Sequence, residues 1–137
     1  MGLYLCVFDD DVELQGVEIG SYLDFDFFRS SITELLEDGK AGSRYPTLIL
    51  HSDSDGEWTP IESEALKEEL TAISARLKLF PAVQFRAVWQ QQIGKLLGLR
   101  NICLYDSFID VDGESLVERL LQLCDVAIKS NRPILFQ

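Results

Sequence analysis

The sequence predicts an α+β fold, in which a mixed β-sheet of about four to five strands carries about four packed helices. The chain has 137 residues and a mass of 15.5 kDa, which fits a single domain spanning residues 1–137. Short apolar runs rich in β-forming residues intermix with longer segments whose apolar residues recur at helical spacing. Because the two kinds of segment do not alternate strictly, α+β is favoured over a regular βαβ arrangement.

Short apolar runs predict five strands. The first is a continuous run from Leu3 to Phe8, and an acidic loop is predicted after it at residues 9–16. A polar loop is predicted at residues 51–57. The remaining strands are predicted at residues 17–20, 47–50, 107–111 and 133–136.

Local start and stop signals predict the first two helices. Ser21 or Asp24 can cap a helix that ends before Gly39. Thr59 can cap a second helix, since Pro follows at the first helical position and Glu62 stands at the capping-box position. An apolar stripe follows each cap, as expected of helices packed on one face.

Two more helices are predicted in the second half of the chain. One carries Trp89 and Ile93 and ends at Gly98. The other follows the turn at Asp112 and Gly113, and its apolar residues from position 116 to position 128 lie on one side.

The charge of the chain is strongly negative and unevenly distributed. The net charge is −11, and residues 9–38 and 53–69 each hold many acids and a single base. Residues 71–105 hold five bases and no acid. Such a protein repels nucleic acid and anionic membranes and attracts basic partners, so we expect neither nucleic acid nor membrane as its ligand.

The three cysteines predict a reduced protein. Cys6, Cys103 and Cys124 are odd in number, far apart in sequence and set among apolar neighbours. With a single histidine, the chain shows no ligand spacing for a metal, and no cofactor is expected. The apolar N-terminal run is too short for an export signal or a membrane span, so a cytoplasmic location is predicted.

Carboxylates at predicted strand ends suggest an alternative function. If those strands were parallel, the carboxylates would meet at one edge of the sheet and could hold Mg²⁺ or Ca²⁺. A small metal-dependent hydrolase would then use Asp9, Asp11, Asp53 and Asp110. Asp is also common in turns and helix caps, which explains the same pattern without a site. His51 is the one conventional imidazole base, and no nucleophile motif accompanies it.

The favoured candidate site is an acidic surface for protein recognition. Carboxylates raise the rate of association with a basic partner, and an exposed aromatic such as Trp58 would supply a buried anchor. A solvated acidic face, with Trp58 packed inside, is the competing interpretation. The candidate residues are Asp9, Asp10, Asp11, Glu13, Glu18, Asp24, Asp26, Asp53, Asp55, Glu57 and Trp58.

Six segments, in their order and spacing, resemble the bacterial immunity protein 70 family. They are residues 1–9 (MGLYLCVFD), 16–22 (GVEIGSY), 42–47 (GSRYPT), 50–58 (LHSDSDGEW), 108–113 (FIDVDG) and 133–137 (PILFQ). The resemblance implies a non-enzymatic antidote of a polymorphic toxin system, which binds and silences a cognate toxin. Charge adds the expectation that the toxin has a basic surface. The protein itself could be a monomer or a homodimer.

Overall fold

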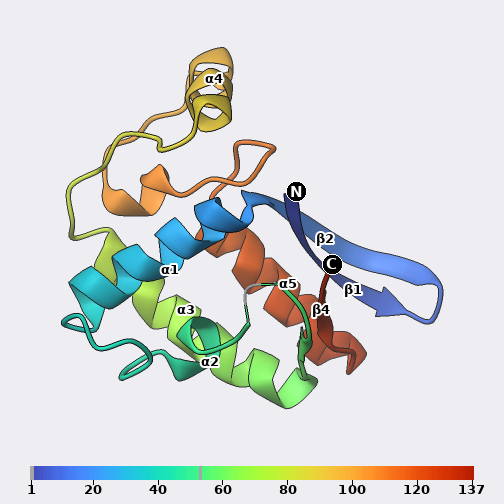
Figure 1. Ribbon diagram of the computed structural model, residues 1–137. Helices are drawn as coiled ribbons and strands as arrows, with labels where there is room; N and C mark the ends of the chain where they lie inside the picture. The colour runs from blue at the N-terminus through green and yellow to red at the C-terminus, as the bar shows by residue number, and fades with distance from the viewer. Residues whose placement is uncertain (1, 53) are drawn as a thin grey trace.

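A computed structural model describes residues 2–52 and 54–137 of the chain, and it confirms the α+β class (Figure 1). A long N-terminal hairpin is followed by helices, two short strands and one 3₁₀ turn. In chain order the elements are β1 (Gly2–Asp9), β2 (Val12–Ser21), α1 (Tyr22–Leu36), α2 (Pro46–Ile49), β3 (Glu57–Trp58), α3 (Pro60–Leu77), α4 (Val88–Leu97), η1 (Leu104–Ser107), α5 (Leu116–Ser130) and β4 (Ile134–Phe136).

The four strands form one sheet in the order β2-β1-β4-β3. Each neighbouring pair is antiparallel, where the sequence had predicted a mixed sheet. The late strand β4 therefore lies between β1 and β3, which are formed much earlier in the chain. The antiparallel pairing also means that successive strand ends do not meet at one edge.

The predicted acidic loop at residues 9–16 is wrong, because most of it belongs to β2. The chain turns tightly at Asp10, whose φ of 54° is the left-handed conformation that Asp tolerates better than most residues. Asp9 already pairs with Val12 across the turn. The acidic residues that follow are therefore strand residues with fixed directions.

Helices whose start signals are local were predicted correctly. At α1 the Ser21 hydroxyl accepts from Asp24 N at 3.1 Å, and the Asp24 carboxylate accepts from Ser21 N at 2.8 Å. Thr59 and Glu62 form the same reciprocal pair at α3. Gly98 ends α4 in the left-handed conformation, as predicted.

The predicted strand at residues 47–50 is instead the short helix α2. Glu69 of α3 accepts hydrogen bonds from Thr47 N and Leu48 N at 3.1 and 3.0 Å, which caps the start of the helix. At its other end, the Arg29 guanidinium donates to the carbonyl oxygens of Leu48 and His51. Both caps come from distant residues, so no local signal predicts them.

The predicted strand at residues 107–111 is also wrong. The segment begins at Ser107, which is the last residue of the turn η1, and Ile109 makes a single antiparallel bridge with Ser115. The buried Asp110 closes the loop by accepting from the backbone N–H groups of Asp112 and Glu114, each at 3.0 Å. Arg119 of α5 lies 3.3 Å from the same carboxylate.

The core lies between one face of the sheet and the helices α1, α3 and α5 (Figure 1). Leu3, Leu5 and Val7 of β1 alternate with the outward residues of that strand and are completely buried. The helix α4 stands apart at one end of the molecule (Figure 1). In the described part of the chain, we find no helix with the length and apolar character needed to cross a membrane.

Candidate protein interface

The face of the sheet that turns away from the core carries both aromatic and acidic side chains. The register sets Tyr4 opposite Glu18, and Phe8 opposite Glu13. Because directly paired residues project to the same side of a sheet, these four side chains share one face. None of the four belongs to the core cluster of the described residues.

A single row of paired residues crosses this face through all four strands. It runs from Gly16 on β2 through Cys6 and Leu135 to Glu57 on β3. The carboxylates therefore stand on the two outer strands, and the apolar side chains lie between them. We call this surface the open sheet face; it is formed by Tyr4, Cys6, Phe8, Glu13, Gly16, Glu18, Glu57 and Leu135.

The hydroxyl end of the Tyr4 ring lies against Gly16 and is hydrogen-bonded to Glu13. A Cβ atom at position 16 would overlap the Tyr4 hydroxyl, so only glycine leaves room for this ring. The Tyr4 hydroxyl donates to Glu13 Oε1 at 2.6 Å. This hydrogen bond, with burial and the negative charge of Glu13, raises the pKa of Tyr4 to about 12. Burial and the charge of Glu13 also raise the pKa of the Cys6 thiol beneath.

The tip of the β1–β2 hairpin extends the acidic surface beyond the sheet (Figure 1). Asp9, Asp10 and Asp11 are all exposed there. Arg132, which lies just before β4, contacts Asp9 at 2.8 Å and Asp10 at 3.5 Å. These exposed pairs balance part of the charge at the tip and contribute little to stability.

Trp58 does not provide the exposed aromatic that the sequence suggested, because it is completely buried. It pairs with Ile134 on the core side of the sheet, and its indole N–H donates to Thr47 O at 3.0 Å. His51 and Phe136 lie against its ring. The alternative that the sequence left open, Trp58 packed inside, is the observed one.

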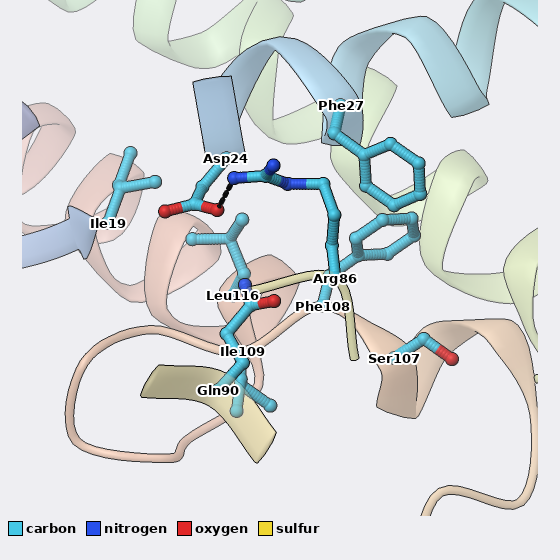
Figure 2. A pocket seen from close by; sticks show the side chains of 9 residues that line it. All are labelled: Ile19, Asp24, Phe27, Arg86, Gln90, Ser107, Phe108, Ile109 and Leu116. Carbon is cyan, nitrogen blue, oxygen red and sulfur yellow. Dashed lines mark hydrogen bonds and ion pairs between the residues drawn. The ribbon is translucent and has the colours of Figure 1, made fainter. Parts of the chain in front are cut away.

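Asp24 is likewise buried, and its partners are structural (Figure 2). Besides capping α1, its carboxylate pairs with the Arg86 guanidinium and accepts from Trp89 Nε1 at 3.2 Å. It therefore joins the start of α1 to the α4 region. A partner cannot reach it while these contacts are made.

The other predicted site residues are spread over the surface. Asp26 is exposed on α1 and lines a separate hollow on that helix. Asp55 is exposed in the segment before β3, and Asp53 lies outside the described residues. Of the eleven candidates, the structure brings Glu13, Glu18 and Glu57 together on the open sheet face, with the hairpin tip beside them.

The carboxylates of the hydrolase alternative that lie in the described part of the chain do not form one site. Asp9 pairs with Arg132 at the hairpin tip, whereas Asp110 is buried beside Arg119. Burial raises the pKa of Asp110, as expected for a carboxyl away from water. In the described ranges, no group of three or more His, Cys, Asp or Glu residues is arranged to hold a metal ion.

His51 occupies a packed position. Its ring stacks on Phe136 with 4.3 Å between ring centroids. Its two nitrogens lie 2.8 and 2.9 Å from the backbone oxygens of Ser52 and Glu57. These contacts indicate a structural role for His51 in the loop that leads into β3.

Tyr4, Phe8 and Leu135 were not among the predicted site residues. A continuous apolar run such as residues 3–8 is typical of a buried strand, so it does not indicate which of its side chains face outward. The neighbouring strand holds the signal that could have distinguished the outward residues of this run from its core residues, because Glu13 and Glu18 stand among apolar residues there. Pairing that strand with the first would have placed the acids beside Tyr4 and Phe8.

Comparison with known families gives one match. Neither the curated proteins nor the solved structures contain a significant match to this chain. The profile of the Immunity protein 70 family matches residues 3–136. That range includes all of the hairpin except Gly2, the open sheet face and the helices described above, so the chain belongs to the Immunity protein 70 family.

Proposed function

We propose that this immunity protein binds and neutralises a cognate bacterial toxin by stoichiometric occlusion, without catalysis of its own. The open sheet face and the hairpin tip form the surface that docks on a basic patch of the toxin. The observation that carries this proposal is the apolar middle of that face with carboxylates along both edges. Apolar centres within polar rims are the usual anatomy of protein interfaces.

The two kinds of side chain contribute differently to binding. Tyr4 and Phe8 are partly exposed and offer aromatic area that a partner can bury. Glu13, Glu18 and Glu57 are exposed at the edges, where charges speed association and orient the partner. The net charge of −11 adds a long-range attraction for a basic protein. We place the interaction in the cytoplasm.

Charge reversal on the open sheet face tests the proposal. The variant Glu18→Lys with Glu57→Lys should weaken binding to the toxin encoded beside this protein by more than about tenfold, which is about 1.4 kcal/mol. Both residues are exposed, so the fold should persist. Titration calorimetry measures the affinity, and growth of cells that express the toxin measures protection.

A matched variant controls for net charge. Glu64→Lys with Glu68→Lys makes the same change on an exposed part of α3. Its affinity should stay within about twofold of the wild type, since distant surface charges act weakly. Equal affinities for both variants would contradict the proposal. They would point to residues 79–102, which expose Leu79, Val88, Leu96 and Ile102.

A further inference from the structure

An open groove of about 440 Å³ lies between α4 and the open end of the β1–β2 hairpin, where β1 begins and β2 ends. This end is opposite the acidic hairpin tip. The groove adjoins the open sheet face, because Glu18 belongs to both. Its volume lies within the range of pockets that hold small molecules, so it has room for one long side chain. The residues that line it are Gly2, Glu18, Gly20, Ser21, Trp89, Ile93 and Val111.

Two glycines and a fixed tryptophan shape this groove. A Cβ atom at Gly20 would lie 2.8 Å from Trp89 Cζ2, so the indole ring lies directly against the backbone of β2. The ring is held in place by the hydrogen bond from its Nε1 to Asp24. Gly2 adds backbone without a side chain. The groove is therefore already formed before any partner arrives.

Glu18 places a carboxylate in this largely apolar groove. Its Oε1 lies 3.7 Å from the position that a Cβ of Gly2 would occupy. The backbone oxygen of Glu18 accepts from Val111 N at 3.1 Å, which fixes the strand at this point. An apolar side chain that filled the groove would bury the Glu18 charge without a partner, which is costly.

We propose that the groove is a subsite for one arginine side chain of the bound protein. The stem packs on Ile93 and Val111, and the guanidinium lies over the Trp89 ring and pairs with Glu18. Arginine suits such a site because its planar cation stacks on aromatic rings and hydrogen-bonds to carboxylates. The identity of the bound protein as a toxin rests on the proposed function, whereas the chemistry of the subsite does not.

An NMR titration of the full chain with a short probe peptide tests the subsite. The probe is Ac-Gly-Arg-Gly-NH₂, and its control replaces arginine with neutral, nearly isosteric citrulline. The Trp89 indole signal and the Gly20 and Ile93 amides should shift with the arginine peptide, and at least about fivefold less with citrulline at the same concentration. The buried Trp58 indole should stay unchanged and serves as an internal reference.

Two variants separate the charge of the groove from its shape. Glu18→Gln should weaken binding of the arginine peptide by about fivefold, and the exposed Glu64→Gln should leave it unchanged. Gly2→Leu keeps Glu18 but fills the groove, so it should abolish the Trp89 shift. Gly2 has no positive φ, so its backbone conformation suits a side chain, but the new Cβ would lie 3.3 Å from Gly20 O and requires a small local shift.

Defined results would overturn the subsite. Equal shifts with arginine and citrulline, shifts spread evenly over the acidic surface, or no shift at Trp89 would each do so. The titration contains no toxin, so such a failure leaves the proposed function to the charge-reversal test. Conversely, an arginine-specific shift together with unchanged toxin binding by Glu18→Lys with Glu57→Lys would retain the subsite and reject the proposed function.

Discussion

The pair of Tyr4 and Glu13 shapes the open sheet face. The Tyr4 ring needs the empty space above Gly16, and its hydroxyl needs the carboxylate of Glu13. The pair covers Cys6, which is completely buried although it points away from the main core. An aromatic ring tethered by a hydrogen bond is thus presented beside the acidic edge.

Removal of Glu13 should change the ionisation of Tyr4. In Glu13→Ala, the pKa of Tyr4 should fall from about 12 toward its ordinary value of about 10, because the carboxylate no longer stabilises the neutral phenol. The ¹³C shift of the Tyr4 ring, followed against pH, measures this change. Glu57→Ala removes an acid from the same face without touching Tyr4 and should leave that pKa near 12. An unchanged Tyr4 pKa in Glu13→Ala would show that the hydrogen bond does not persist in solution.

The burial of two residues, Trp58 and Asp24, could not be predicted from the sequence. Trp58 stands beside acids in the sequence and was therefore read as a possible surface anchor, yet the pairing of β3 with β4 turns it into the core. Asp24 was counted with its exposed neighbours, although Arg86 and Trp89, more than 60 positions away, bury it. Strand register explains the burial of Trp58, and long-range contacts explain the burial of Asp24. Neither can be predicted from the neighbouring residues in the sequence.

At the scale of elements, α4 is held to the body mainly by side chains rather than by broad packing. Asp24 binds Arg86 and Trp89, and Trp89 lies against Gly20. Burial alone would raise the pKa of Asp24, but hydrogen bonds from Ser21, Arg86 and Trp89 outweigh it and lower the pKa. Its stabilising contribution is therefore complete above the unfolded carboxyl pKa of about 3.9, and it is lost as pH falls through the lower folded value.

Loss of the Asp24 carboxylate should release α4 from α1. In Asp24→Ala, amides of residues 88–97 should exchange with solvent at least about tenfold faster, and global stability should drop by about 2 kcal/mol with the lost cap. Hydrogen exchange and urea unfolding measure the two effects. Asp26→Ala, an exposed change on the same helix, should alter neither. If α4 exchange were the same in both variants, other contacts would have to hold that helix.

Elements with local sequence signals were predicted correctly, and elements that depend on distant residues were not. Helices α1, α3, α4 and α5 were predicted because their caps, glycines and apolar stripes are local. The helix α2 and the turn around Asp110 were mistaken for strands, because Glu69, Arg29 and Arg119 reach them from other elements. The strand β3 was missed because two residues carry no periodicity. Of the candidate site, Glu13, Glu18 and Glu57 were among the predicted residues, but their shared face was not predicted.

At the scale of the whole molecule, the negative charge should govern the rate of complex formation. We expect the association rate with the toxin to fall by about tenfold or more as ionic strength rises from about 0.01 M to about 1 M, since the Debye length shrinks from about 30 Å to about 3 Å. Stopped-flow mixing measures this rate. The dissociation rate should change much less. An association rate independent of salt would contradict a charge-guided encounter.

The position of β4 has a consequence for the timing of folding. This strand joins β1 to β3, yet it is translated more than 120 residues after β1 ends. Residues 134–136 must therefore be translated before β4 can pair with β1 and β3. Until then, the β1 edge of the hairpin has no partner strand. Products of interrupted translation would carry the acidic hairpin without the completed open sheet face, so under the proposed function only chains translated through β4 would present the whole docking surface.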